Sequence, residues 1–328
     1  MVGPFLRGCA WPAGAGVAYP RADPADFSRL PIDTWATAQF PAGVRVEFVG
    51  DAEAVEIGYS TSGDNLGYRG DGAGRTFSLW QGGEKVAEAA AVLGSGTVVL
   101  PRAEPAPNER SITYLPEGMR PVVESITPIG GGIEPAPPQP RWLAYGDSIA
   151  EGWTASEPAL AWPAVTGRAL SLDVINLGYA GSARGEMVTA EQLAALPTPA
   201  VITISHGTNC WTRIPHSVDM MGATTGAFLD IVRQGHPEVP IVVVSPVVRP
   251  DAEATANRLG GTLAALRSAM EEAVEARIRG GDRRLTLVPG RPLLPSQLLA
   301  DGVHPGDEGH QVLATSIGAA IKEAIKIT

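Results

Sequence analysis

RWLAYGDSIAEGW, residues 141–153, is the stretch that decides the fold. Its first residues are mostly apolar and predict a buried strand, and the Gly-Asp-Ser at 146–148 then turns the chain into a helix. Serine is a favoured helix N-cap residue, so capping alone explains Ser148 in this stretch. The other interpretation is an enzyme nucleophile placed where a strand meets a helix. The rest of the chain has to separate the two.

The sequence after residue 141 alternates buried-type strands with amphipathic helices. Four further strands are predicted at DVINLG (173–178), AVITISHG (200–207), IVVVSPV (241–247) and LTLVPG (285–290). Helices are predicted at 158–171, 186–196, 224–236, about 252–279 and about 309–325. Continuous Val/Ile runs between helices indicate an α/β fold with a parallel sheet covered on both faces. In such a sheet a ligand site forms beyond the carboxyl ends of the strands.

The sequence before residue 132 has a different rhythm. Short β-rich segments are separated by Gly, Asp and Pro: GVRVEFVG, AVEIGYSTS, TFSLWQ, GTVVLP, SITYLP and PVVESITPIGG. This pattern is typical of a β-sandwich. The Gly- and Pro-rich GGGIEPAPPQP at 130–140 then indicates a linker. We therefore expect a β-sandwich domain at 1–132, a linker at 133–140 and an α/β domain at 141–328.

Composition narrows the classes of function. The 328 residues suit two domains, and 44% hydrophobic with 18% charged residues is ordinary for a globular protein. The net charge is -10 with no basic run, so nucleic acid and anionic membranes are not expected partners. Two cysteines, Cys9 and Cys210, give no disulfide framework, and Arg7 interrupts an N-terminal apolar segment too short for a signal sequence. We expect a cytoplasmic protein without membrane spans.

Four polar motifs follow predicted strands or open predicted helices. They are GDSI (146–149), NLGYAGSA (176–183), GTN (207–209) and DGVHP (301–305). Each has a structural explanation when taken singly. Ser148 can be a cap, Gly181 a turn residue, Asn209 an Asx-turn, and Asp301 with His304 a surface loop.

Taken together, the motifs supply the groups that acyl transfer requires. Ser148 is placed at a helix N-terminus, which favours negative charge, and His304 can accept its proton. Asp301, three residues earlier, can orient the imidazole. The backbone N–H groups of Ser148 and Gly181 and the side-chain amide of Asn209 are candidate oxyanion-hole donors.

This ordered set resembles the SGNH (GDSL) hydrolase superfamily, and the resemblance covers most of residues 141–328. It implies a three-layer α/β/α flavodoxin-like fold, a Ser148–His304–Asp301 triad, an oxyanion hole that includes Gly181 and Asn209, and no metal or cofactor. Cys210 stands where family members often have Asp, and Ile replaces the commoner Leu in GDSI. No G-x-S-x-G elbow, H-E-x-x-H or Cys/His cluster supports another hydrolase class. Cys210 is more readily explained as a small buried residue than as a nucleophile.

Several residues near the motifs are candidates for the substrate pocket. Trp211 and Arg213 come directly after the strand that leads to Asn209. Trp153 follows the nucleophile and could reach the cleft, although core packing is the preferred interpretation for Trp153. Arg249 is a further candidate at the same edge. Core packing is expected for Trp162, and hydrogen-bonded structural roles are expected for His206 and His216.

Two-domain members of the superfamily suggest the substrate class. The arrangement resembles jelly-roll carbohydrate acetylesterases, and it resembles GDSL acyltransferases that take an acyl group from a coenzyme A thioester to decorate polyketides. We expect an O-acyltransferase that uses an acyl-CoA co-substrate and a hydroxylated natural product, with ester hydrolysis as a side activity. The alternatives are a carbohydrate or small-ester deacetylase and a non-catalytic carbohydrate-binding protein. The first domain is open to three roles: carbohydrate binding, a lid over the cleft, or oligomerisation.

Overall fold

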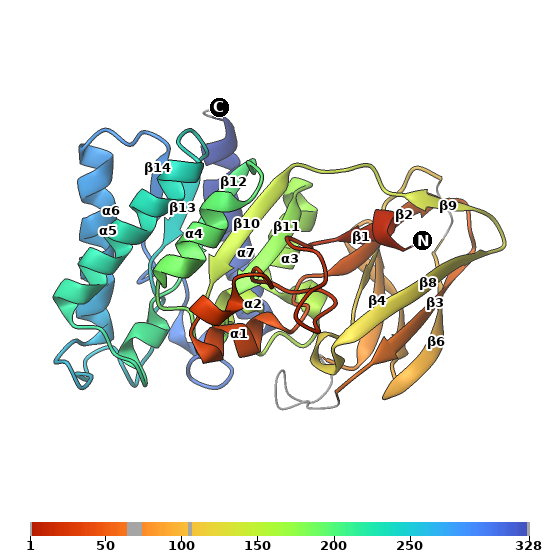
Figure 1. The fold of residues 1–328 in the computed structure, drawn as a ribbon, viewed down its shortest axis with the longest axis horizontal. Coiled ribbons are helices and arrows are strands. Elements are labelled where there is room, and N and C mark those ends of the chain that lie inside the picture. The colour runs from red at the N-terminus through yellow and green to blue at the C-terminus, as the bar shows by residue number, and fades with distance from the viewer. Residues whose placement is uncertain (1, 64–73, 104–106, 327–328) are drawn as a thin grey trace.

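The computed structural model describes residues 2–63, 74–103 and 107–326, which form an α/β region beside an N-terminal β region (Figure 1). The α/β region is built on a five-stranded parallel sheet in the order β11-β10-β12-β13-β14. Its strands are β10 (Arg141–Gly146), β11 (Asp173–Gly178), β12 (Val201–Ser205), β13 (Ile241–Val244) and β14 (Leu285–Val288). In sequence order this is 2-1-3-4-5, the flavodoxin-like order. The predicted fold class is confirmed.

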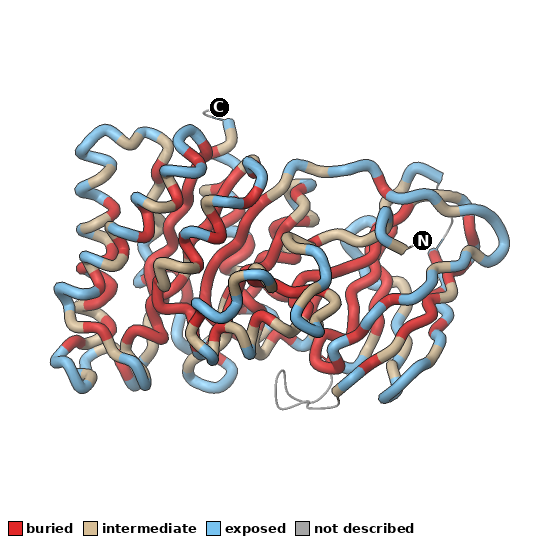
Figure 2. The backbone as a smooth tube through the Cα atoms, in the orientation of Figure 1, coloured by how far each residue is buried: buried red, intermediate tan, exposed pale blue. Residues whose placement is uncertain are grey.

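Helices cover both faces of this sheet. They are α2 (Ser148–Glu151), α3 (Trp162–Leu170), α4 (Met187–Ala195), α5 (Val218–Gly235), α6 (Leu263–Arg279) and α7 (Asp307–Lys326). Side chains of β10 alternate between two cores: Leu143 and Tyr145 pack with α4, α5 and α6, whereas Trp142 and Ala144 pack with α3 and α7. The sheet is therefore the buried middle layer of three (Figure 2).

The N-terminal β region consists of two antiparallel sheets. One has the order β1-β2-β7-β4-β5 with β9 also paired to β2, and the other has the order β6-β3-β8. The strands are β1 (Leu6–Arg7), β2 (Arg45–Gly50), β3 (Ala54–Thr61), β4 (Thr76–Gln81), β5 (Glu84–Ala90), β6 (Gly94–Pro101), β7 (Ser111–Tyr114), β8 (Pro121–Ile129) and β9 (Ile133–Pro135). Phe48 and Phe77 of the first sheet share one core with Ile57 and Leu100 of the second. The predicted β-rich N-terminal region is confirmed.

The structure corrects the start of two helices and adds elements that the sequence pattern did not predict. The helix predicted at 224–236 begins at Val218, because Ser217 caps it by accepting the N–H of Met220 at 3.2 Å. The helix predicted from about 252 begins only at Leu263, because Gly260 has a φ of +83° and Thr262 caps α6 by accepting the N–H of Ala265 at 3.1 Å. Strand β5 follows a two-residue turn, Gly82-Gly83, with φ of +57° and +92°. Such a turn closes a tight hairpin. Strand β9 lies inside the segment expected to be a linker and pairs with β2.

An N-terminal segment crosses to the α/β region. We call residues 21–38, which include the short helix α1 (Ile32–Ala38), the strap. Ala22, Leu30 and Ala38 of the strap are buried in the same core as strands β10 and β11 and helices α4 to α6. The segment between β1 and β2 thus contributes to the core that supports the parallel sheet.

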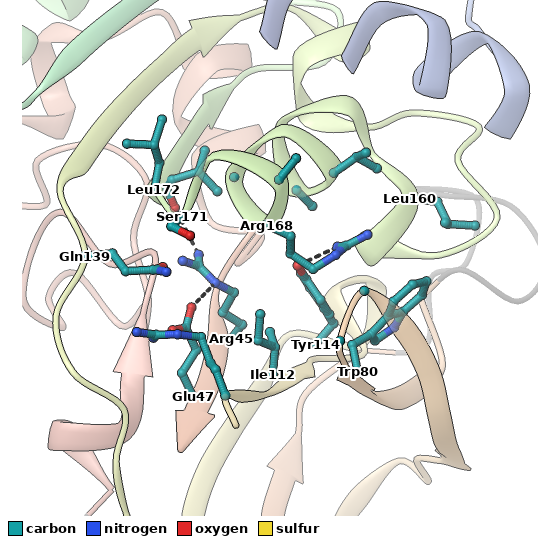
Figure 3. Close-up of a pocket in the computed structure, with 18 of the residues that line it drawn as sticks. Arg45, Glu47, Trp80, Ile112, Tyr114, Gln139, Leu160, Arg168, Ser171 and Leu172 are labelled. Atoms are coloured by element: carbon teal, nitrogen blue, oxygen red, sulfur yellow. Dashed lines mark hydrogen bonds and ion pairs between the residues drawn. The ribbon is translucent and has the colours of Figure 1, made fainter. Parts of the chain in front are cut away.

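A pocket of about 570 Å³ lies where the β region meets α3 (Figure 3). Arg168 of α3 donates to the Tyr114 hydroxyl at 2.8 Å, and its guanidinium lies 4.5 Å from the Trp80 ring centroid. Arg45 pairs with Glu47 at 2.6 Å and with Asp173, at the start of β11, at 2.9 Å. The pocket therefore lies near the amino ends of the strands, away from the motifs at their carboxyl ends.

Candidate active site

Ser148 lies just beyond the carboxyl end of β10. The side chain of Asp147 accepts the N–H of Ile149 at 3.0 Å, so Asp147 is the N-cap of α2 and Ser148 is its first residue. Gly146 permits the sharp turn, because a Cβ there would lie 2.5 Å from the side chain of Ala150 and 2.6 Å from the Ser205 carbonyl oxygen. The strand order reverses between β10 and β12, which is where ligand sites form in this fold.

Ser148, His304 and Asp301 form a continuous hydrogen-bonded set. Ser148 Oγ lies 2.8 Å from His304 Nε2, and His304 Nδ1 lies 2.7 Å from Asp301 Oδ2. The other carboxylate oxygen of Asp301 accepts the N–H of His304 at 2.7 Å and that of Val303 at 2.9 Å. Because the carboxylate faces Nδ1, that nitrogen carries the proton and Nε2 is left to accept the serine hydroxyl.

The pKa values suit this arrangement. Burial lowers the pKa of His304 below its ordinary value; the Asp301 carboxylate offsets part of this effect, and Arg249 adds to it. Burial alone would raise the pKa of Asp301, but hydrogen bonds from His304 and Val303 outweigh it and the pKa lies below its ordinary value. At neutral pH the pair is a neutral imidazole beside a carboxylate, which is the form that accepts a proton.

Gly181 and Asn209 follow the two strands on either side of β10. Gly181 has a φ of +72°, and a Cβ on it would meet no atom within 4 Å, so this face of the loop is open. Asn209 is buried in the turn Thr208–Trp211, and its amide lies 3.5 Å from the Ala183 carbonyl oxygen. The loop that carries Gly181 is thus joined to Asn209. Among the described residues, the N–H groups of Ser148 and Gly181 have no protein acceptor.

Comparison with known proteins assigns the family. The family model for the GDSL-like lipase/acylhydrolase family matches residues 144–312, just over half of the chain. The chain belongs to this family. The match covers Ser148, Gly181, Asn209, Asp301 and His304, and it makes the protein an enzyme of the GDSL type that transfers or hydrolyses acyl groups. No curated protein matches the sequence.

Solved structures share the fold over nearly the whole chain. A Bacteroides ovatus protein assigned as a GDSL-like lipase has a TM-score of 0.81 at 22% identity, covering 98% of this chain and 95% of that one. The salicylyl-acyltransferase SsfX3 from a tetracycline biosynthetic pathway has a TM-score of 0.82 at 22% identity, covering 97% and 94%. A family two carbohydrate esterase from Clostridium thermocellum, solved with cellohexaose, has a TM-score of 0.65 at 16% identity, covering 86% and 92%. These likenesses establish a shared fold.

The candidate substrate-binding residues lie in different surroundings in this GDSL enzyme. The ring of Trp153 is tilted against that of His304 with centroids 5.9 Å apart, so it borders the hydrogen-bonded set. Trp211 donates to the Thr255 carbonyl oxygen at 2.7 Å. The guanidinium of Arg249 lies over the Trp211 ring, 5.2 Å from its centroid. Arg213 is exposed. Of these residues, Trp153 has the direct contact with the proposed triad.

Four residues near the motifs are buried. Trp162 is buried against Trp142, with centroids 5.6 Å apart, as expected for core packing. Cys210 is fully buried and burial raises the pKa of its thiol, which leaves little thiolate for nucleophilic attack. The hydrogen-bonded role expected for His206 is wrong: within the described chain neither ring nitrogen has a partner, and burial lowers its pKa to about 3. The ring instead packs against Tyr145 and Phe228. His216 is also buried, and its Nδ1 has no partner within the described chain.

Sequence reasoning missed two buried charged residues beside the Gly181 loop. Glu151, at the end of α2, accepts the N–H of Ala180 at 2.7 Å and lies 3.6 Å from Arg21 of the strap. Burial raises the pKa of Glu151 to about 7 although Arg21 and the Ala180 N–H lower it. The position of Glu151 three residues after Ser148 was the available signal, but no motif connects it with a residue 130 positions earlier.

Proposed function

We propose that the protein is a serine-dependent O-acyltransferase that forms an acyl-enzyme on Ser148. The observation that carries this proposal is the continuous hydrogen-bonded set, with 2.8 Å from Ser148 Oγ to His304 Nε2 and 2.7 Å from His304 Nδ1 to Asp301 Oδ2. A nucleophile, a base and a group that orients the base are the minimum for this chemistry. The shared GDSL family membership supports the same assignment.

The proposed reaction uses an acyl-CoA thioester as donor and has two half-reactions. Ser148 Oγ attacks the thioester carbonyl while His304 takes the serine proton; the C–S bond then breaks, and His304 delivers that proton to the leaving thiolate. In the second half, an acceptor hydroxyl loses its proton to His304 and attacks the acyl carbon. The bond to Ser148 Oγ breaks, and the proton returns to the serine. No oxidant, reductant or metal is needed for this balance.

The oxyanion of each tetrahedral intermediate requires donors at one position. We assign this role to the N–H groups of Ser148 and Gly181 and to the amide of Asn209. The N–H groups of Ser148 and Gly181 have no protein acceptor in the described chain. The amide of Asn209 belongs to a buried side chain that follows β12, the strand next to β10. Removal of one such donor typically costs ~100-fold to ~1,000-fold in turnover.

The acceptor that we propose is a hydroxyl of a polyketide-like natural product. SsfX3, a salicylyl-acyltransferase, shares the fold across both regions of this chain with a TM-score of 0.82, compared with 0.65 for the cellohexaose-bound esterase. The sequence expectation of a cytoplasmic enzyme is consistent with an acyl-CoA donor. The second candidate is a carbohydrate or small-ester deacetylase, which the fold shared with that esterase supports. A purely carbohydrate-binding role would leave the intact hydrogen-bonded set without a purpose.

Product partition separates the two enzyme classes. The protein is incubated with acetyl-CoA or benzoyl-CoA and a panel of hydroxylated polyketide and carbohydrate acceptors, with Ser148→Ala as the control. We expect acylated polyketide product to form faster than free acid, and neither to form with Ser148→Ala. Faster release of free acid than of any acylated product across the panel would favour the deacetylase.

A further inference from the structure

A buried ion pair between Arg21 and Glu151, which are distant in sequence, contacts the backbone of the loop that carries Gly181. We call residues 178–184 the Gly181 loop. Arg21 of the strap and Glu151 of α2 are 1% and 0% exposed and lie 3.6 Å apart. Glu151 accepts the N–H of Ala180, the residue before Gly181, at 2.7 Å. The pair thus contacts the backbone immediately preceding the proposed oxyanion donor.

Arg21 links this loop to the end of the strap. Its Nε donates to the Phe40 carbonyl oxygen at 2.6 Å, its Nη2 to that of Thr37 at 2.8 Å, and its Nη1 to that of Gly178. The Tyr179 hydroxyl donates back to the Arg21 carbonyl oxygen. A planar guanidinium can serve three carbonyls in fixed directions, whereas the ammonium of lysine is a single point on a flexible stem. The geometry therefore specifies arginine.

Helix α1 contacts the peptide that bears the Gly181 N–H directly and, through Arg184, the peptide that follows it. The Thr37 hydroxyl, shared with the Asp33 carbonyl oxygen at 3.0 Å, lies 3.3 Å from the Ala180 carbonyl oxygen. Arg184 donates to the Gly181 carbonyl oxygen at 3.1 Å and pairs with Asp33 at 2.8 Å. In a trans peptide the C=O and the next N–H point in opposite directions. A contact between α1 and the Ala180 carbonyl therefore turns the Gly181 N–H away from α1.

We propose that Arg21 and Glu151 are positioning residues that hold the Gly181 N–H in the oxyanion hole, so that the strap completes the active site. This inference rests on the proposed function, in which Gly181 is an oxyanion donor. Neither residue touches the reacting atoms; both act through the backbone of residues 178–181. Burial of two charges is costly, and apolar side chains would attach the strap at least as firmly. What the ion pair adds is a fixed orientation of this backbone.

The test replaces both charges together, so that no unpaired charge stays buried. In Arg21→Met/Glu151→Met we expect kcat on an activated aryl ester to fall about 10- to 100-fold with little change in KM, because a small displacement of an oxyanion donor has a cost of this order. The affinity for phenylboronic acid, which forms a tetrahedral adduct with the serine, should fall by a similar factor. The single variant Glu151→Gln should retain most of the kcat of the unmodified protein, because the glutamine amide oxygen can still accept the Ala180 N–H.

A second buried charged cluster, in which Arg45 and Glu47 pair with each other and also with Asp173 and Arg110, provides a control for the loss of buried charge. Arg45 and Glu47 are 3% and 1% exposed and lie at the pocket between the regions (Figure 3), far from the strand ends that carry the motifs. Arg45→Met/Glu47→Met should lower the thermal midpoint without changing kcat or boronate affinity. A purely structural role for Arg21 and Glu151 predicts the same behaviour for both double variants.

The outcomes separate this inference from the proposed function. If the Arg21/Glu151 double variant is folded and keeps kcat and boronate affinity within about twofold, the positioning role is wrong, whereas the loss of turnover in Ser148→Ala would still stand. If Ser148→Ala itself retains turnover, the proposed function fails first. Should the double variant not fold, Arg21→Lys decides: kcat and the boronate affinity must fall together with KM nearly unchanged, and an unchanged kcat overturns the proposal.

Discussion

His304 has one ring nitrogen on Asp301 and the other on Ser148, and its environment keeps it neutral at pH 7. Burial lowers its pKa, and the Asp301 carboxylate raises it part of the way back. The activity should therefore be constant at neutral pH and fall only as the pH drops below the ordinary histidine value of ~6.5, where the protonated ring can no longer accept the serine proton.

Replacing the carboxylate tests both functions of Asp301. In Asp301→Asn the amide cannot favour the productive tautomer, and kcat should fall by ~1,000-fold to ~10,000-fold. The loss of a negative neighbour should also lower the pKa of His304 further, so the acid limb of kcat/KM should move to lower pH. The measurement is the pH profile on an aryl ester between about pH 4.5 and 8. An acid limb that moves to higher pH would contradict the assigned geometry.

The sequence was sufficient to place the candidate site residues that follow a local pattern. Ser148, Gly181, Asn209 and the Asp301–His304 pair each follow a strand or precede a helix, and the carboxyl ends of parallel strands necessarily meet at one edge. Arg21 and Glu151 carry no such pattern. Their partners are backbone atoms of a distant loop, and only tertiary packing brings these together.

At the scale of elements, close approach between α2 and β11 determines where the loops start. A Cβ on Gly178 would lie 2.3 Å from the backbone nitrogen of Glu151, so no other residue fits there without separating strand from helix. Gly222 in α5 provides a contrast, because a Cβ there would meet only the Ala269 carbonyl oxygen, at 3.7 Å.

Replacing each of these two glycines by alanine should change the stability of the protein in opposite directions. Gly222→Ala should stabilise the protein by about 0.5–1 kcal/mol, because alanine restricts the unfolded chain and favours the helix. Gly178→Ala should destabilise it by more than about 1 kcal/mol, and it should lower kcat because Gly178 begins the Gly181 loop. Chemical denaturation measures both. Equal stability of the two variants would show that the approach of α2 to β11 is not tight.

Strands of the parallel sheet were predictable because their Val/Ile runs are continuous. Among the elements that were not predicted correctly, three have a clear physical reason. The sequence of β5, EKVAEAA, has charged residues and alanine, and it is a strand because the Gly82-Gly83 turn pairs it with β4. Helix α1 is only seven residues long and is held by packing. The start of α6 was placed too early because residues 252–262 contain helix-forming residues before the Gly260-Gly261 break.

At the scale of the whole molecule, the two regions are joined on both sides of the sheet. Arg45 and Arg168 connect the β region with β11 and α3, and the strap contributes to the core beneath the Gly181 loop. Composition and linker signals suggested two separable domains, and that division stays a prediction. Neither composition nor the linker predicts the strap, which crosses from the β region to the α/β region. Within the described residues no helix is long and apolar enough to span a membrane, and no three His, Cys, Asp or Glu side chains gather as a metal site.

The acyl-enzyme tests the central claim most directly. The protein is mixed with benzoyl-CoA without an acceptor, quenched in acid within seconds, and its intact mass is measured before the modified peptide is sequenced. We predict a mass increase of one benzoyl group on the peptide that contains Ser148, none in Ser148→Ala, and an undiminished adduct in Cys210→Ala. An adduct that persists in Ser148→Ala, or one that maps to Cys210, would contradict the serine mechanism.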